Sequence, residues 1–244
     1  MTYHPYTQNP DSFYLIFNEF QNLLKAYNPR LKLYQGESGC PSILEWGFAL
    51  NNYPWTEYSQ AKWNMRRMAG DWARNIRTSI FTMVDLNYGF MLQSFGQLRA
   101  DLNHKIIYKR PSFYGIQHMT AFFDDTVRPT GLLAYESNTT RKMEVAGFSK
   151  ADTPVVMAWY NDQTPGDTLA LDPITLTIKG VMFKDPVYVE MITGRVYSLE
   201  KDSWKVTDGS TVFTGLPMWD SPVMLAERTQ VILQDSVKQG KSKK

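Results

Sequence analysis

The sequence predicts an α/β fold, with parallel strands and covering helices in its first half and an antiparallel β-sandwich in its second half. Two observations carry this prediction. Residues 1–127 alternate short strand-like runs with amphipathic helical segments, which is the pattern of β-α-β units joined into a parallel sheet or barrel. From about Thr130 the helical periodicity gives way to short β-rich runs between turn sequences, which is typical of a sandwich.

The first half begins with the end of a strand, a helix and a second strand. Thr2–Tyr6 is predicted to end a strand, and Asn9-Pro10-Asp11 is a helix-start signal with proline in the first turn. Asn28-Pro29 ends that helix, and Leu31–Gln35 is predicted as the next strand. Helical spacing predicts one apolar face on this first helix, made of Phe13, Ile16, Phe17, Phe20, Leu23, Leu24 and Tyr27.

A second and a third helix follow in the sequence. Between them, Thr78–Val84 is a near-continuous apolar run that suits a strand buried on both faces, and it ends in Asp85. A loop then leads to Pro111, where the third helix is predicted to begin, and this helix is expected to end near Asp124. The second helix is predicted to carry one apolar face, made of Tyr58, Ala61, Met65, Met68, Ala69 and Trp72.

The strongest functional signal lies between the second strand and the second helix. Leu31–Gln35 runs directly into Gly36 and Glu37, and Gly39 follows two residues later. Barrel enzymes place reacting groups at the carboxyl ends of strands, because the loops there converge on one mouth. The flanking glycines let the backbone turn sharply and approach a ligand closely. Glu37 is therefore the candidate catalytic residue.

Five segments in order resemble the last part of a (β/α)8-barrel (TIM-barrel) glycoside hydrolase of the large retaining clan, clan A. They are YHPY, LYQGESGCPS, QAKWNMRRMAGDWA, SIFTMVDL and KRPSFYGIQHMTAFFDD. The resemblance is densest over residues 31–125 and corresponds to strands six, seven and eight with their helices. The third and fourth segments are similar to members whose barrel is followed by a β-sandwich. The resemblance therefore implies a partial TIM barrel over residues 1–127 and a β-sandwich accessory domain over residues 128–235.

The same resemblance implies a set of site residues. In that clan the nucleophilic glutamate stands at the end of strand seven, which is the place that Glu37 occupies. A His or Tyr at the end of strand six commonly lines the sugar site. The implied activity is retaining hydrolysis of O-glycosyl bonds in an oligosaccharide or glycoside, without a cofactor or a metal. The candidate substrate-binding residues are His4, Tyr6, Trp46, Trp55 and Asp85.

One departure from the family pattern concerns the second carboxyl group. A retaining mechanism needs two carboxyl groups about 5–5.5 Å apart, and the clan's acid/base glutamate stands at the end of strand four. Neither Glu45 nor Asp85 resembles that acid. We therefore expect a carboxyl-terminal fragment that is inactive alone and that self-associates or lacks an amino-terminal half. The alternative is a non-catalytic carbohydrate-binding or scaffolding protein.

Composition restricts the partners and says little about location. The net charge of +2 over 244 residues favours neither nucleic acid nor an anionic membrane as a partner. Cys40 is the single cysteine, so the chain cannot form an internal disulfide. The sequence shows no signal peptide and no long apolar stretch. Secretion or a periplasmic location of the parent protein stays open. Residues 236–244 are predicted to form a basic disordered tail.

The second half is predicted to contain short strands that pack as a structural support for the barrel. A carbohydrate-binding role is the alternative for this half, because Trp159, Tyr188 and Trp204 are available to stack on sugars. The predicted strands are Leu132–Tyr135, Met143–Phe148, Val155–Tyr160, Leu169–Leu171, Leu176–Ile178, Val187–Ile192, Arg195–Leu199 and Val223–Leu233.

Two other chemistries have partial support in the sequence. Gly36–Cys40 nearly spells the nucleophile elbow of α/β-hydrolases, with Ser38 as nucleophile and His104 or His118 as base, but Cys40 stands where the elbow needs glycine. The histidines are far apart in the sequence and lack metal-ligand spacing. The pair Arg66–Arg67 could bind an anion, although on a helix such residues more often reach a carboxylate or the surface.

Overall fold

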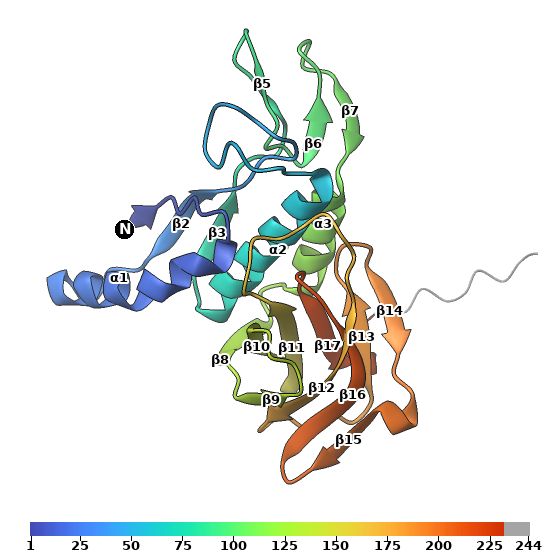
Figure 1. Cartoon of the computed structure of the whole chain (residues 1–244). Helices are drawn as coiled ribbons and strands as arrows, with labels where there is room; N and C mark the ends of the chain where they lie inside the picture. The colour runs from blue at the N-terminus through green and yellow to red at the C-terminus, as the bar shows by residue number, and fades with distance from the viewer. Residues whose placement is uncertain (232–244) are drawn as a thin grey trace, which may run out of the picture.

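The computed structural model of the chain describes residues 1–231. A small parallel sheet with helices forms one end of the molecule, and two larger antiparallel sheets form the other (Figure 1). The parallel sheet has the order β1-β2-β3, and both strand pairs are parallel. Its strands and the helices of the first half are β1 (Thr2–Tyr3), η1 (Pro10–Phe13), α1 (Tyr14–Tyr27), β2 (Tyr34–Ser38), α2 (Glu57–Ala73), β3 (Arg77–Ile80) and α3 (Pro111–Phe122).

The predicted strands of the first half exist but their bounds were wrong. The second strand begins three residues later than the predicted Leu31–Gln35. It extends to Ser38, so Glu37 is its next-to-last residue. The run Thr78–Val84 forms a strand only through Ile80, and its residues are half-buried rather than buried on both faces. Beyond Ile80 the chain still bonds to a neighbouring segment, since Leu98 N–H donates to the Met83 carbonyl (2.9 Å).

The predicted loop before Pro111 contains two hairpins. They rise from the same end of the parallel sheet and stand beside each other in Figure 1. Strands this short carry no alternating pattern, and for that reason the sequence did not reveal them. The first hairpin pairs β4 (Leu86–Asn87) with β5 (Leu92–Gln93), and the second pairs β6 (Leu98–Ala100) with β7 (Ile106–Lys109).

Helices α1 and α2 pack on one face of the parallel sheet. Tyr3 of β1 stacks on Phe13 with ring centroids 4.9 Å apart, and Thr78 Oγ1 of β3 donates to Asp71 of α2 (2.9 Å). The predicted apolar face of α1 is only partly buried. Ile16, Leu23 and Tyr27 are exposed, and Phe20 is half-buried against Tyr3 and Phe13. Within the helix only Phe17 and Leu24 are buried.

The predicted single apolar face of α2 was also wrong, in the opposite sense. Only Glu57, Tyr58 and Trp72 of this helix are not buried. The helix begins with a capping box between Thr56 and Ser59. It then runs between the parallel sheet on one side and α3 with the antiparallel sheets on the other (Figure 1).

The second half of the chain forms two antiparallel sheets, as the short strands predicted. Their orders are β14-β13-β17-β11-β10-β8 and β15-β16-β12-β9. Buried apolar residues of both sheets belong to one continuous core that also includes apolar residues of α2. The strands are β8 (Val127–Leu132), β9 (Tyr135–Ser137), β10 (Met143–Lys150), β11 (Thr153–Tyr160), β12 (Asp172–Lys179), β13 (Pro186–Glu190), β14 (Arg195–Ser198), β15 (Trp204–Thr207), β16 (Ser210–Met218) and β17 (Val223–Glu227), with short helical turns η2 (Lys201–Ser203) and η3 (Arg228–Gln230).

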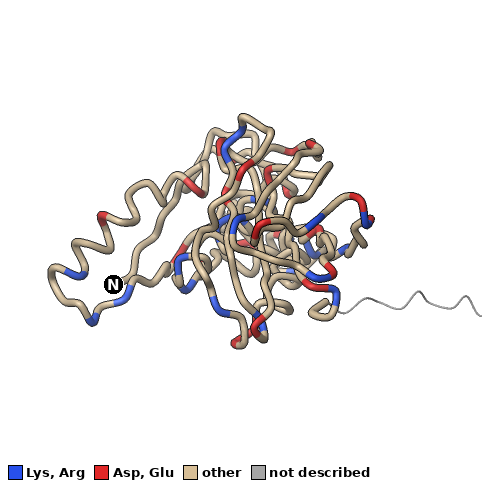
Figure 2. The backbone as a smooth tube through the Cα atoms, turned by 90° about the horizontal axis from the view of Figure 1, so that it is seen from below, with Lys and Arg blue, Asp and Glu red and all other residues tan. Residues whose placement is uncertain are grey.

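Some predictions for the second half need correction. Leu169–Leu171 is a loop segment, whereas β15 and β16 were not predicted. The last predicted strand ends at Glu227, and the tail predicted for residues 236–244 lies outside the described residues. Figure 2 shows acidic and basic residues interspersed along the chain trace.

Candidate functional site

Glu37 lies in an irregular segment near the carboxyl end of β2. The pairing with β3 shifts register between Gln35 and Ser38, so Gly36 and Glu37 together face the single residue Ser79. Such bulges re-aim side chains at sheet edges and next to active sites. The buried Gln35 side chain fills the gap in the ladder, since its Oε1 accepts the Ser79 N–H at 2.6 Å.

The two glycines beside Glu37 are required by space. A Cβ at Gly36 would lie 2.1 Å from Thr2 Cγ2, and a Cβ at Gly39 would lie 1.9 Å from the carbonyl oxygen of Phe81. Neither glycine has the positive φ that the expected sharp turn would need. The glycines therefore serve the close approach of neighbouring backbones rather than a left-handed conformation.

Tyr6 holds the carboxylate of Glu37. The Tyr6 hydroxyl donates to Glu37 Oε1 at 2.8 Å, and both residues are half-buried. Burial, together with this hydrogen bond, raises the pKa of Tyr6 far above its usual range, so the phenol stays a neutral donor at physiological pH. The bond restrains one oxygen of Glu37 and leaves Oε2 available for chemistry.

A buried support positions the segment that carries Tyr6. The Tyr6 ring makes an edge contact with Phe95, at 6.4 Å between centroids. The carbonyl of Pro5 accepts from Ser38 Oγ (3.3 Å) and from Arg67 Nη2 (3.4 Å). The polar residues of α2 therefore anchor the chain between β1 and η1, a role that sequence patterns did not reveal.

His4 lies beside Gly36, the residue before Glu37, whereas Trp46 lies on the surface of the following loop. His4 is exposed, and its Nε2 lies 3.3 Å from the point where a Cβ at Gly36 would be. Trp46 is 78% exposed, so its indole face is open to a ligand. The structure thus brings Tyr6 into contact with Glu37 and places His4 next to Gly36.

Trp55 was predicted to contact the substrate, but it is buried away from the surface. Its side chain is buried, and Nε1 donates to the Leu50 carbonyl at 2.7 Å. It packs in a small core with Cys40 and Trp63. Trp55 therefore shapes the loop after β2 and presents no surface to a sugar.

Asp85 also has a structural role in place of the predicted contact with substrate. Its buried carboxylate accepts from Arg110 Nη1 (2.6 Å) and Nη2 (2.9 Å), and from the backbone N–H groups of Gly96 and Ala100. These bonds join both hairpins to the start of α3. An acid so fully bonded is not free to contact a ligand.

The hairpin β4–β5 contributes residues that the sequence did not point to. The Tyr88 hydroxyl, in the turn between these strands, donates to Gln93 Oε1 at 3.4 Å. Its ring packs against Phe48 at 5.1 Å between centroids. The turn formed by Asn87 and Gly89, in which Gly89 has a φ of 82°, was the available signal for this hairpin.

Glu45 is a second carboxylate of this region. It is buried, and Oε1 accepts the backbone N–H of Ser94 at 2.6 Å, while Oε2 has no hydrogen-bond partner in the described part of the chain. Burial raises the pKa of Glu45. The bond fixes the loop after β2 to the segment that carries Phe95.

The hydrolase elbow does not form. Ser38 is fully buried and donates to the Pro5 carbonyl, while His104 lies in an exposed turn and His118 faces the Met191 carbonyl at 3.0 Å. Within residues 1–231 no group of three or more His, Cys, Asp and Glu side chains could hold a metal. In the same range, no helix has both the length and the apolar character needed to cross a membrane.

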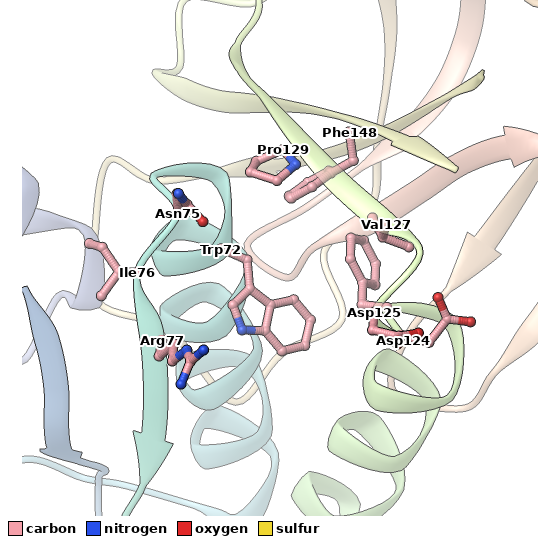
Figure 3. A pocket seen from close by; sticks show the side chains of 10 residues that line it. Trp72, Asn75, Ile76, Arg77, Asp124, Asp125, Val127, Pro129 and Phe148 are labelled. Atoms are coloured by element: carbon pink, nitrogen blue, oxygen red, sulfur yellow. The ribbon is translucent and has the colours of Figure 1, made fainter. Parts of the chain in front are cut away.

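A separate hollow of about 460 Å³ lies at the opposite end of the parallel sheet. Asn75, Ile76 and Arg77 line it where β3 begins, and Trp72 and Phe148 stand across from them (Figure 3). The amino-terminal edge of such sheets serves stability rather than catalysis. The hollow therefore does not belong to the site around Glu37.

Comparison with known proteins places the fold and leaves the family open. The sequence matches no protein-family profile and no curated protein. Among solved structures, a glycoside hydrolase family 5 protein from Bacteroides vulgatus aligns with a TM-score of 0.51 and 15% identity, covering 88% of this chain and 45% of its own. The GH51 arabinofuranosidase from Xanthomonas axonopodis pv. citri aligns with a TM-score of 0.51 and 13% identity, covering 89% and 45%. The chain thus has a glycoside hydrolase-like fold and spans less than half the length of the structures it matches.

Proposed function

We propose that this chain is the carboxyl-terminal part of a (β/α)8-barrel retaining glycoside hydrolase, with its accessory β-sandwich, and that Glu37 is the nucleophile. One observation carries the proposal: Glu37 lies at the carboxyl edge of the parallel sheet with its carboxylate oriented by Tyr6. The similarity of fold to two glycoside hydrolases supports a carbohydrate as substrate. In this proposal residues 1–127 belong to the barrel and residues 128–235 to the sandwich.

The geometry suits Glu37 to the nucleophilic step. Its free oxygen, Oε2, attacks the anomeric carbon, and the bond from that carbon to the leaving oxygen breaks. Tyr6 donates to Oε1 and holds the carboxylate in one orientation. His4 and the exposed Trp46 are the proposed sugar contacts, and the exposed Tyr88 of the β4–β5 hairpin is a proposed further aromatic contact.

Neither Asp85 nor Glu45 is suited to act as the general acid. Asp85 is bonded to Arg110, and Glu45 is buried with one oxygen on the Ser94 backbone. We propose that a segment outside the described residues supplies the second carboxyl group. The chain alone would then carry half of the site and lack turnover of glycosides whose leaving group needs a proton.

The edge of the parallel sheet is the proposed place for that segment. Strand β1 is the outer strand of its sheet, so its second edge is unpaired within the described residues. Beside it, Leu23 and Tyr27 of α1 are 68% and 87% exposed. A further strand and helix would cover both features, and without them we expect the chain to self-associate.

The proposed nucleophile can be tested without a general acid. A dinitrophenyl 2-deoxy-2-fluoroglycoside loses its phenolate without protonation, so Glu37 should displace the phenolate and form an ester with the fluorosugar. We expect intact-mass measurement to show one added fluoroglycosyl group for the reactive sugar of a panel, and peptide mapping to place it on Glu37. Glu37→Gln should abolish the addition, because an amide does not displace the leaving group.

Glu45→Gln is the matched control, since it changes a second glutamate near the same loop. Labelling that persists in Glu37→Gln and disappears in Glu45→Gln would assign the nucleophile to Glu45 and refute our proposal. Tyr6→Phe should slow labelling while leaving the site of labelling unchanged, because the carboxylate loses its orienting donor.

The second candidate function is a non-catalytic carbohydrate-binding or scaffolding protein. One observation favours it: within residues 1–231 we assign no carboxyl group as the general acid. Under that function, neutral oligosaccharides would bind while no member of the fluoroglycoside panel labels Glu37. The labelling experiment therefore separates the two functions.

A further inference from the structure

A second cavity lies on the antiparallel part of the molecule. Its volume is about 500 Å³, within the range of sites that enclose a small molecule. It opens between the first turn of α2, the loop before β12, and the hairpin β13–β14, which stand next to one another in Figure 1. None of its lining residues belongs to the site around Glu37.

Two cross-strand pairs form one wall of this cavity. Tyr188 of β13 faces Tyr197 of β14, and Glu190 faces Arg195 in the next register position of the same face. The tyrosine rings meet edge to face, with centroids 6.0 Å apart and planes at 64°. Tyr58 of α2 also lines the cavity, so several aromatic side chains border one space.

Tyr188 supplies the cavity with a hydrogen-bond donor. The residue is only 5% exposed, but its hydroxyl is not among the fully buried polar atoms, so the exposed part of the side chain includes this hydroxyl. Burial raises the pKa of Tyr188 far above its usual range, so the phenol stays protonated and able to donate. The hydroxyl can therefore donate to water or to a ligand that occupies the cavity.

The charged groups of the wall favour a neutral ligand with hydroxyl groups. Glu190 already accepts the backbone N–H groups of Ile192 (2.8 Å) and Thr193 (2.9 Å). Arg195 is exposed and its guanidinium forms no ion pair within residues 1–231, while the carboxylates of Glu190 and Glu200 border the same space. One guanidinium against two carboxylates gives an anion no net attraction.

The apolar part of the lining selects a ring with an apolar face. Leu169 and Leu171 are exposed at 59% and 46% beside the tyrosine rings. Aromatic and aliphatic side chains cover the C–H face of a sugar ring, and hydroxyl and guanidinium groups bond to its rim. A hydrocarbon would leave the Tyr188 hydroxyl without a partner.

We infer that this cavity is a second carbohydrate site, which binds one glycosyl unit of a neutral oligosaccharide on Tyr188 and Tyr197 at a distance from Glu37. The choice of a sugar as ligand rests on the proposed function, whereas the existence of the site rests on the cavity itself. In this role the site holds a substrate chain without cleaving it.

The test uses the full chain and isothermal titration with neutral disaccharides (cellobiose, maltose and lactose). We expect one of them to bind with a dissociation constant on the order of 1 mM. Tyr197→Ala removes an exposed ring, Tyr188→Phe removes only the hydroxyl, and each should weaken binding by about tenfold. Tyr27→Ala, which removes an exposed tyrosine of α1, and Glu37→Gln should both leave the dissociation constant unchanged.

Three outcomes would overturn the inference in distinguishable ways. Binding that is lost in Glu37→Gln and kept in both Tyr188 and Tyr197 variants would place the sugar at the catalytic site and still support the proposed function. Binding of benzyl alcohol without any disaccharide would show that the ligand class is wrong. The absence of any binding would overturn the second site, while labelling of Glu37 by the fluoroglycoside would remain an independent result.

Discussion

Helices α1 and α2 differ in what surrounds them more than in what the sequence predicted for them. Both were expected to bury one apolar face. In α1 only Phe17 and Leu24 are buried, because the helix packs on the parallel sheet and η1 and reaches α2 only near its first residue, Tyr14. In α2 only Glu57, Tyr58 and Trp72 escape burial, since the antiparallel sheets cover the side that faces away from the parallel sheet. The comparison shows that neighbours, rather than periodicity, set how much of a helix is buried.

The same difference governs the charged residues. Lys25 of α1 is exposed. Lys62 of α2 is buried and pairs with Asp220 at 2.7 Å, and Arg66 pairs with Asp11. Each pair connects α2 to a different segment, one before the helix and one in the antiparallel part. These buried pairs fix the orientation of the two parts of the molecule.

Among the variants that test the role of the buried pairs of α2, Asp11→Ala is expected to lower the free energy of unfolding the most. The Asp11 carboxylate accepts from Arg66 Nε at 2.8 Å and from Trp159 Nε1 of β11 at 3.0 Å, so its loss leaves a buried guanidinium without a carboxylate partner and a buried indole N–H without an acceptor. We expect the free energy of unfolding to fall by about 3–5 kcal/mol, measured by urea denaturation. Asp185→Asn, at the exposed pair with Arg228, is the control and should cost at most about 1 kcal/mol. Equal losses in the two variants would show that α2 does not depend on its buried pairs.

A matched pair of truncations compares the two helices directly. Met65 of α2 is fully buried, and Met65→Ala should lower the free energy of unfolding by about 2–5 kcal/mol through lost packing. Leu23 of α1 is 68% exposed, and Leu23→Ala should change it by less than about 0.5 kcal/mol. Thermal and urea denaturation of both variants would check this. A large loss at Leu23 would mean that the exposed side of α1 is covered in solution.

The buried acid of α2 should make stability depend on pH. Burial raises the pKa of Asp71 to about 6, against about 3.9 in the unfolded chain. The folded chain holds this proton more tightly, so the contribution to stability is fully present below about pH 4 and is lost as pH rises through about 6. The two pKa values imply a change of about 3 kcal/mol.

Asp71→Asn isolates that contribution from those of the other carboxylates. The variant keeps an acceptor for Tyr14, whose hydroxyl donates to Asp71 Oδ1 at 2.8 Å. Relative to the original chain, it should therefore become more stable on going from pH 4 to pH 8. A stability difference between the two chains that is constant over this range would contradict the raised pKa.

The smallest effect on stability, and a clear effect on association, is expected at the exposed side of α1. Leu23→Glu and Tyr27→Ser place polar groups on a surface that we propose receives another strand and helix. Size-exclusion chromatography with light scattering should show the original chain self-associating and the double variant shifted toward the monomer. A monodisperse monomer for the original chain would show that the exposed residues need no cover.

The sequence anticipated the order of the three parallel strands and three α-helices of the first half, but not its two hairpins, because these strands and helices carry local signals. Asn9 and Thr56 accept the backbone N–H groups that begin η1 and α2. It also predicted that Tyr6 and Glu37 lie close together, because residues at the ends of neighbouring parallel strands meet, and the Tyr6 hydroxyl does donate to Glu37. For Trp55 and Asp85 the same reasoning was wrong, since residue type and position do not reveal which polar partners a loop will supply.

Local signals determined the elements of this chain, and tertiary packing determined their surroundings. Helix caps, prolines and alternating apolar residues act over a few positions, so the sequence alone established α1, α2, α3 and the antiparallel character of the second half. The burial of Arg66, the bonds of Asp85 to Arg110, and the contact of Tyr6 with Glu37 join residues 25 or more positions apart. Such contacts form only when several elements pack together, because each one depends on partners whose positions no local pattern fixes.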